Sequence, residues 1–337
     1  MRKRLWQNLG RLFVLGFEGK SFPVEWDSLS KEFGPFGIIL FSQNIDSSYF
    51  EVIERWRQAR SLFGCAPLFC IDQEGGRVKR ISGEYFEVPA PLNLAQTKSP
   101  NEIKNLSRTL AYNLRSIGIG WNLAPVADIY HPECSVIKDR AWHENPQVAA
   151  RYVCAWVEGQ MMEKVASCLK HFPGHGRALV DTHHERSKLN VNLTELWRHE
   201  AIPFIFGIRA GAESVMLAHI ELQDDKLPSS LSPRVIDYLR SGLKFPGLIV
   251  TDDLCMAAVS NRSGIADAAT AAISAGCDIA MVSKNADEQA KAMEQSAGLF
   301  QSPRFASALS QKIVRATTFW QKFSVQSTSG VLKRLYL

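Results

Sequence analysis

The sequence places groups that could bind and protonate a substrate directly after a buried strand. The apolar run from Val165 to Leu169 stops at Lys170 and His171, and the chain continues as Phe-Pro-Gly-His-Gly to residue 176. Because proline and glycine flank the second histidine, His175, a helix is excluded there. We therefore expect these polar groups at a strand end and in its loop, at the rim of a pocket.

An Asp-x-His pair follows in the same loop. Asp181 lies two residues before His183. A carboxylate at this spacing can orient one ring nitrogen of the histidine and leave the other for proton transfer. An isolated Asp-x-His also arises by chance, and its place after the strand is what favours chemistry. No Gly-x-Ser-x-Gly motif supplies a serine nucleophile, so a carboxylate is expected as the partner.

A second charged group follows another apolar run. The segment from Asp72 to Arg80 reads Asp-Gln-Glu-Gly-Gly-Arg-Val-Lys-Arg. Its two glycines permit backbone conformations that are closed to other residues. The mixed acidic and basic groups suit hydrogen bonding to a neutral polyol. A tight turn with a structural ion pair is the alternative, and the residues alone leave both open.

Two adjacent carboxylates end a further strand. Asp252 and Asp253 follow the run Val250-Thr251. Neighbouring side chains of an extended strand point in opposite directions, so only one of the two should face the interior. That one is a candidate nucleophile. The other reading is an N-cap for the next segment, which we expect of Asp253.

Neither a metal nor an organic cofactor is expected. The histidines at positions 171, 175, 183 and 184 invite a zinc interpretation. However, Pro173 and Gly174 break the helix that would align the first two, and no HExxH motif or cysteine supports the site. Gly19-Lys20-Ser21 lacks the first glycine of a phosphate-binding loop, and the Gly-x-Gly pairs lack the third glycine of a dinucleotide fingerprint.

These groups need a frame that brings distant strand ends together. Apolar runs without alternation predict parallel strands that are covered on both faces. Eight strands are expected: Leu12–Gly16, Gly37–Phe41, Pro67–Ile71, Trp121–Val126, Val165–His171, Ser214–His219, Leu248–Thr251 and Ile279–Ser283. Helices are expected near residues 27–33, 49–62, 101–116, 146–163, 193–209, 232–242, 263–275, 285–299 and 303–322. Asn192 and Glu195 form a capping-box pattern at the start of one of them.

This alternation predicts a (β/α)8 TIM-type barrel. A single domain is expected over residues 1–337, with a C-terminal helix and short tail over about residues 303–337. A doubly wound sheet is the alternative. The barrel is favoured because polar residues follow many of the strands, as they do at the catalytic end of such barrels. These residues are Asn44, Asp72, Asp128, Lys170, His171, His219 and Asp252.

Composition excludes several classes of protein. The 337 residues are 46% apolar and 22% charged, and the net charge of +5 is too mild to indicate a nucleic-acid partner. No run approaches the ~18 apolar residues of a membrane span, and the basic start Met1-Arg2-Lys3-Arg4 is not followed by a signal-peptide core. Seven cysteines without a CxxC motif indicate free thiols in a reducing compartment. We expect a cytoplasmic protein, as a monomer, without a membrane or nucleic-acid partner.

Taken together and in this order, four motifs resemble those of glycoside hydrolase family 3. They are Asp72–Arg80, Lys170–Gly176, Asp181-Thr182-His183 and Thr251-Asp252-Asp253-Leu254. The similarity is greatest to the single-domain bacterial β-N-acetylglucosaminidases of peptidoglycan recycling. It implies Asp252 as the nucleophile, His183 as the general acid/base and Asp181 as the partner of His183. It also implies a set of sugar-binding residues: Asp72, Arg80, Arg140, Lys170 and His171.

The resemblance implies an exo-glycosidase that needs no cofactor. Such an enzyme removes terminal, non-reducing N-acetylglucosamine with retention, from N-acetylglucosaminyl-anhydro-N-acetylmuramic acid and its peptides. Two segments depart from the family pattern. Lys138 stands where the family usually has glycine before Asp139-Arg140, and Ala141-Trp142 replaces Ser-Phe after it. Arg177 to Val180 stand where small and acidic residues are more familiar.

Two other functions remain open on the sequence. A family-3 β-glucosidase or β-xylosidase usually draws its acid/base glutamate from a further C-terminal domain, and the Asp-x-His pair favours the hexosaminidase branch instead. A barrel that binds muropeptides without turnover is the non-enzymatic alternative. Its sign would be a missing nucleophile or acid/base pair, whereas Asp252, Asp181 and His183 are all present.

Overall fold

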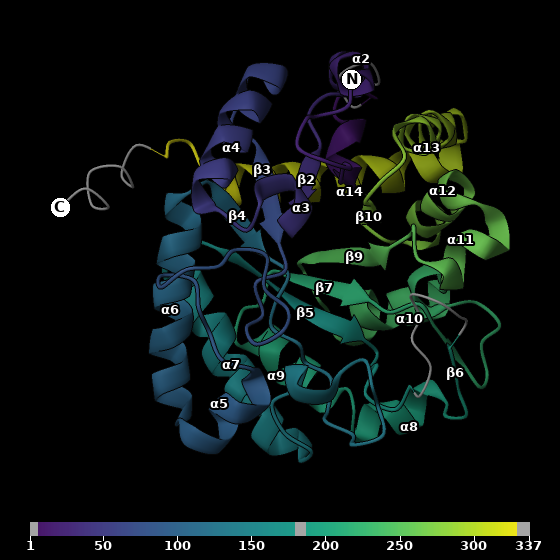
Figure 1. The fold of residues 1–337 in the computed structure, drawn as a ribbon. Coiled ribbons are helices and arrows are strands. Elements are labelled where there is room, and N and C mark those ends of the chain that lie inside the picture. Colours follow the sequence, from purple (N-terminus) through teal and green to yellow (C-terminus); the bar gives the residue numbers. More distant parts are fainter. Residues whose placement is uncertain (1–5, 179–186, 329–337) are drawn as a thin grey trace.

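Eight parallel strands close into a barrel in the computed structural model, which describes residues 6–178 and 187–328. They are β1 (Phe13–Leu15), β2 (Gly37–Leu40), β3 (Leu68–Ile71), β4 (Ile119–Asn122), β5 (Ala166–Phe172), β7 (Ser214–Leu217), β9 (Leu248–Asp253) and β10 (Ile279–Val282). Their order is β1-β10-β9-β7-β5-β4-β3-β2, closing on β1. Helices surround the strands (Figure 1). The (β/α)8 barrel is confirmed, and the doubly wound alternative is wrong.

Each predicted strand coincides with one barrel strand, because the apolar runs are buried on both faces. The largest difference is in β4, which covers Ile119–Asn122 instead of Trp121–Val126. Its start includes Gly120, where an added Cβ would lie 1.9 Å from the carbonyl oxygen of Phe323. Its regular pairing ends before Pro125, which has no N–H to donate to the ladder.

The helices follow the predicted pattern with some breaks. They are α2 (Glu25–Phe33), α3 (Ser42–Ile45), α4 (Tyr49–Phe63), α5 (Pro91–Thr97), α6 (Pro100–Ser116), α7 (Pro146–Met162), α8 (Leu193–Arg198), α9 (Ile202–Arg209), α10 (Pro233–Asp237), α11 (Ala257–Ser263), α12 (Ile265–Ala275), α13 (Ala286–Gly298) and α14 (Pro303–Phe323). Short 3₁₀ segments are η1 (Leu9–Leu12), η2 (Lys138–Arg140), η3 (Ser229–Leu231) and η5 (Leu299–Gln301), and η4 (Tyr238–Gly242) is a π-turn that extends α10.

Two of the breaks have clear causes. The single helix expected over 193–209 is wrong, because α8 ends at Arg198 and α9 begins at Ile202. Pro203 lies in the first turn of α9, where its missing N–H breaks no hydrogen bond. Gly264, with φ 79°, separates α11 from α12. The predicted capping box is confirmed: the N–H of Glu195 donates to Asn192 Oδ1 at 2.9 Å, and the N–H of Asn192 donates to Glu195 Oε2 at 3.2 Å.

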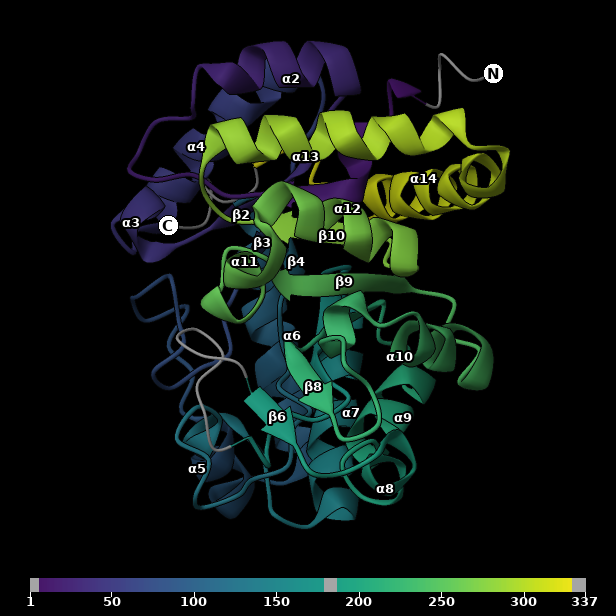
Figure 2. The same cartoon turned by 90° about the vertical axis from the view of Figure 1, so that its right-hand side faces the viewer.

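A two-stranded parallel sheet lies beside the barrel and is absent from the sequence prediction. It pairs β6 (Ser187–Leu189) with β8 (Ile220–Leu222), and Figure 2 shows the two strands side by side. Each strand has only three residues, too few for a detectable period. The sheet ties the chain that leads into α8 to the loop after β7.

The amino end of the barrel is closed by aromatic packing. Trp121 of β4 is fully buried and donates its indole N–H to Ser214 Oγ at 2.9 Å. Phe319 of α14 packs edge-on against it, with ring centroids 5.0 Å apart. The C-terminal helix is therefore part of the barrel's floor.

Among the described residues, no helix combines the length and apolar character that a membrane crossing requires.

Candidate active site

A cavity of about 300 Å³ opens at the carboxyl ends of the barrel strands, where the sequence predicted the polar groups to meet. Six predicted site residues line it: Asp72, Arg80, Arg140, Lys170, His171 and Asp252. They come from the loops after β3 and β4, from β5 and from β9. The other two, Asp181 and His183, lie outside the described residues.

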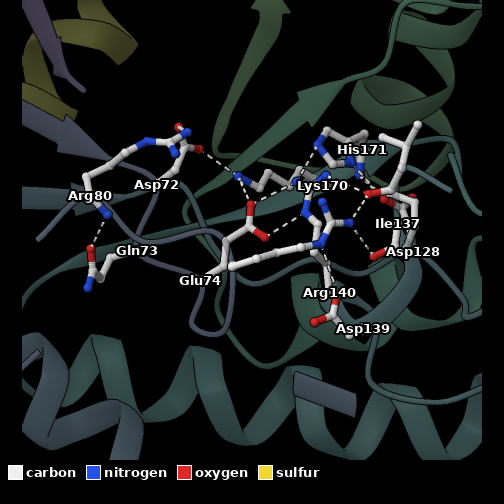
Figure 3. Close-up of polar contacts among 12 residues, drawn as sticks. Asp72, Gln73, Glu74, Arg80, Asp128, Ile137, Asp139, Arg140, Lys170 and His171 are labelled. Carbon is white, nitrogen blue, oxygen red and sulfur yellow. Dashed lines mark hydrogen bonds and ion pairs between the residues drawn. The ribbon is translucent and has the colours of Figure 1, made fainter. Parts of the chain in front are cut away.

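Lys170 is the centre of the charged network (Figure 3). Its Nζ lies 2.7 Å from Asp72 Oδ1 and 2.6 Å from Glu74 Oε1, with the side chain 2% exposed. Burial alone would lower the pKa of Lys170, but Asp72 and Glu74 outweigh burial and raise the pKa above its usual value. The ammonium therefore stays charged at neutral pH.

Asp72 is held from two sides. Besides Lys170, it accepts a hydrogen bond from Arg80 Nη2 at 3.0 Å. Burial would raise the pKa of Asp72, but the two cations hold the pKa well below its ordinary range. Arg80 also lies over the ring of Phe41, with its guanidinium carbon 5.6 Å from the ring centroid. A carboxylate fixed in this way can accept further hydrogen bonds from hydroxyl groups without rearranging.

Arg140 and Glu74 form a bidentate pair in the same wall. Arg140 Nε donates to Glu74 Oε2 at 2.8 Å, and Nη2 donates to Oε1 at 2.9 Å. Burial opposes ionisation of Glu74, yet Arg140 and Lys170 lower its pKa to about 2. The departures from the family pattern therefore leave Arg140 in the cavity. Lys138, at the usual glycine position, adopts the left-handed conformation with φ 41°.

Asp128 orients two histidines. Its Oδ2 lies 2.7 Å from His171 Nδ1 and accepts the His171 N–H at 3.1 Å, and its Oδ1 accepts the His175 N–H at 2.7 Å. Since a carboxylate only accepts hydrogen bonds, His171 carries its proton on Nδ1. Nε2 then faces Arg140 Nη2 at 3.4 Å as an acceptor. Burial lowers the pKa of His175 to about 4, so this ring is neutral at physiological pH.

The two carboxylates at the end of β9 differ in what they hold. Asp253 accepts hydrogen bonds from the N–H groups of Cys255 and Ser283, each at 3.1 Å, and from the Ser283 hydroxyl. Asp252 Oδ1 accepts the Asp253 N–H at 2.8 Å. Both residues are among those that line the cavity. Of the two, Asp253 is committed to the loops.

The N-cap role expected of Asp253 is wrong. The helix after β9 is α11, which begins at Ala257 with Met256 at its N-cap position. The carboxylate of Asp253 instead joins the β9 loop to the β10 loop. The backbone carbonyl oxygen of Asp253 lies 2.9 Å from His219 Nε2, and His219 Nδ1 lies 2.7 Å from Ser230 Oγ. His219 thus supports the loops and lies outside the lining of the cavity.

Sequence reasoning missed three contributors to this site. Glu74 stood within the Asp72–Arg80 motif without a role, although its place two residues after Asp72 was a usable signal. Asp128 was noticed only as a polar residue after a strand. His175 lines the cavity and lies with its ring centroid 5.6 Å from that of His171.

Across residues 6–178 and 187–328, no group of three or more His, Cys, Asp or Glu side chains is arranged to hold a metal ion.

The comparisons with known proteins agree with this arrangement. Residues 29–315 match the model of the glycosyl hydrolase family 3 N-terminal domain. The chain belongs to glycosyl hydrolase family 3. It is 36% identical over 254 residues to a beta-hexosaminidase of Stenotrophomonas maltophilia strain R551-3, covering 73% of this chain and 75% of that relative.

Solved structures of the family superpose closely on the barrel. A family-3 beta-N-acetylglucosaminidase from Paenibacillus sp. str. FPU-7 matches with a TM-score of 0.90 and 30% identity over 96% of this chain. The match spans 63% of that longer protein. NagZ from Neisseria gonorrhoeae, in complex with N-trifluoroacetyl-D-glucosamine, matches with a TM-score of 0.76 and 27% identity over 91% of this chain and 98% of NagZ. The family-3 chain is therefore a glycosidase of the β-hexosaminidase type.

Proposed function

We propose that the chain is a retaining exo-β-N-acetylglucosaminidase that releases terminal, non-reducing N-acetylglucosamine from peptidoglycan fragments. Its substrate would be the disaccharide of N-acetylglucosamine and anhydro-N-acetylmuramic acid, with or without the peptide. The observation that carries this proposal is the cavity in which Lys170, Arg140 and their carboxylates meet Asp252. We infer specificity for N-acetylglucosamine from the activities of the similar proteins. We infer a peptidoglycan fragment as the substrate from the resemblance of the motifs.

The charged network supports a role in binding a neutral sugar. Asp72 and Glu74 are ionised acceptors, whereas Lys170, Arg80 and Arg140 are charged donors. Because each of these charges is paired with an opposite charge within the protein, the pocket presents fixed donors and acceptors and needs no ionic substrate. Hydroxyl groups, which both donate and accept, match such a lining. We assign sugar binding to these residues together with His171.

The chemistry would proceed by two displacements. A carboxylate oxygen of Asp252 forms a bond to the anomeric carbon while the bond from that carbon to the leaving oxygen breaks, and His183 transfers its proton to that oxygen. Water then attacks the glycosyl-enzyme, with His183 accepting the proton of the water and the carboxylate of Asp252 leaving. Asp181 would hold the imidazole in the required tautomer and support the imidazolium.

One assay tests the activity and its residues together. The wild-type enzyme should hydrolyse 4-nitrophenyl β-N-acetylglucosaminide far faster than the matching β-glucoside. Asp252→Asn should lose nearly all turnover, and His183→Ala should lose roughly 10²- to 10⁴-fold, the usual contribution of a general acid. Preference for the glucoside would favour a family-3 β-glucosidase, and full activity of Asp252→Asn would refute the mechanism.

A second assay addresses the natural substrate and the compartment. We expect cleavage of N-acetylglucosaminyl-anhydro-N-acetylmuramic acid to be faster than cleavage of N,N′-diacetylchitobiose at equal concentration. The reverse order would move the proposal from peptidoglycan to chitin fragments. All seven cysteines are free thiols, which supports a cytoplasmic, reducing setting that fractionation of the cells can test.

A further inference from the structure

A buried glutamate outside the sugar pocket faces the segment that follows β5. Glu200 lies in the turn between α8 and α9, and its side chain is 1% exposed. It forms an ion pair with Arg177 Nε. His199 Nδ1 and His131 Nε2 lie 3.3 Å and 3.9 Å from Glu200 Oε1. Two positions that are distant in the sequence, 131 and 177, thus converge with the neighbouring His199 on one carboxylate.

Arg177 supplies the permanent positive charge of this cluster. Burial lowers the pKa of His131, although Glu200 opposes that shift. A neutral His131 leaves the buried carboxylate without a second fixed cation from the β4 loop. Since a buried carboxylate is strongly disfavoured without a charged partner, Glu200 holds Arg177 in place.

The segment that carries Arg177 is packed closely up to its last described residue. A Cβ on Gly174 would lie 2.7 Å from Glu200 Cβ, and a Cβ on Gly176 would lie 2.2 Å from the carbonyl oxygen of Ile129. Ala178 is fully buried, and its N–H donates to the His175 carbonyl oxygen at 2.9 Å. The chain is thus fixed to a point three residues before Asp181 and five before His183.

The far end of the same stretch is also fixed. Ser187, Lys188 and Leu189 form β6, in register with Ile220 to Leu222 of β8. The resemblance leads us to expect small or acidic residues where Arg177 stands, so it does not predict the Arg177–Glu200 pair. The α8–α9 turn thus restrains the stem of the segment that holds the proposed acid/base residue.

We propose that Glu200 is a positioning residue for the general acid: through Arg177 it sets the stem from which the His183 segment departs. This inference rests on the proposed function. A positioning defect should reduce proton donation to the leaving group, since a misplacement of about 1 Å can cost roughly 10²-fold in rate. It should leave sugar binding in the barrel intact, because neither Glu200 nor Arg177 lines the cavity.

The test is the dependence of kcat/KM on the leaving group. A 2,4-dinitrophenyl aglycone departs without protonation, whereas a phenyl aglycone needs the acid. We expect Glu200→Gln and Arg177→Met to lower kcat/KM for phenyl β-N-acetylglucosaminide at least about tenfold, and for the dinitrophenyl substrate less than about threefold. Arg177→Lys should recover part of the loss. The double variant should show no larger difference than either single variant, since the two residues act as one pair.

Matched controls separate this inference from its alternatives. Arg234→Met removes an exposed arginine that pairs with Asp224, and it should leave kcat/KM unchanged for both substrates. Equal losses on both substrates, or no loss, in the half-exposed Arg177→Met variant would overturn the inference, even if Glu200→Gln does not fold. His183→Ala should show the largest difference between substrates. If His183→Ala shows none, it is the proposed acid role that fails.

Discussion

Arg140 donates two hydrogen bonds, of 2.8 and 2.9 Å, to the carboxylate of Glu74, which lies 66 residues away in the chain. The pair joins the loop after β4 to the loop after β3. Because Glu74 also contacts Lys170, one carboxylate is paired with two buried cations. The donors that would face the sugar therefore depend on an acid that was given no role of its own from the sequence.

Removing the charge of Glu74 should damage both stability and activity. Glu74→Gln leaves Arg140 and Lys170 with fewer anionic partners, and breaking a buried pair typically costs about 3–5 kcal/mol. We expect urea denaturation to show a loss of roughly 2–4 kcal/mol and kcat/KM to fall at least about tenfold. Glu87→Gln, which breaks an exposed pair with Lys79, is the matched control and should change stability by less than about 1 kcal/mol. Equal effects of the two variants would contradict this account.

Asp128 should prove as important to His171 as any contact with substrate. Asp128→Asn replaces an acceptor of three hydrogen bonds by an amide that cannot accept on both sides. The imidazole then loses the group that keeps its proton on Nδ1. We expect KM for the chromogenic N-acetylglucosaminide to rise at least about fivefold and stability to drop by roughly 1–3 kcal/mol. Asp139→Asn, at a half-exposed pair with Arg77, is the comparison, and an Asp128→Asn enzyme as good as that control would disprove the role.

Glu213 predicts a pH-dependent stability that is unrelated to catalysis. It directly precedes β7, and burial raises its pKa to about 7, opposed by the hydrogen bond that it accepts from the Ser167 N–H at 3.0 Å. A group whose folded pKa lies above its unfolded value stabilises the fold below about pH 4.5, and this contribution is lost as pH rises towards 7.

Glu213→Gln should therefore match the wild type near pH 5 and exceed it at pH 8 by roughly 1–3 kcal/mol. Chemical denaturation at both values measures the difference. Glu294→Gln, at an exposed site on α13, serves as the control and should show no such trend. A variant that gains nothing on going from pH 5 to pH 8 would show that Glu213 is ionised in the folded protein.

Sugar binding itself should be insensitive to mild acid. Asp72 and Glu74 have lowered pKa values because of Lys170, Arg80 and Arg140, so both remain ionised as the pH falls from 7 to 5. His175 has a pKa of about 4 and stays neutral over the same range. Calorimetry with free N-acetylglucosamine should give dissociation constants within about twofold at pH 5 and 7. A tenfold weakening at pH 5 would contradict this prediction and show that a group of the pocket titrates in this range.

The barrel was within reach of sequence reasoning because each strand is a short apolar run with polar residues at its end. That pattern placed Lys170 and His171 on a strand and Asp252 at the end of another, and the structure agrees. Small elements escaped: β6 and β8 are three residues long, and the break between α8 and α9 depends on one proline that a periodic pattern spans.

The pairings inside the site were out of reach for a different reason. Glu74 bonds to Arg140, and Asp128 bonds to His171, across 66 and 43 residues. No local spacing in the sequence predicts such contacts, because the loops come together only when the barrel closes. The same holds for Asp253, whose carboxylate binds the β10 loop instead of capping a helix.

Trp121 and Phe319 close the amino end of the barrel, so the pocket at the carboxyl end of the strands does not continue through the barrel. A sugar bound in the pocket as proposed must enter and depart through the same mouth, so it lies deeper than the group that was attached to it. The released aglycone then has to clear the entrance first, and the monosaccharide comes out last. Free N-acetylglucosamine should accordingly compete with substrate, and accumulating product would slow turnover of its own accord.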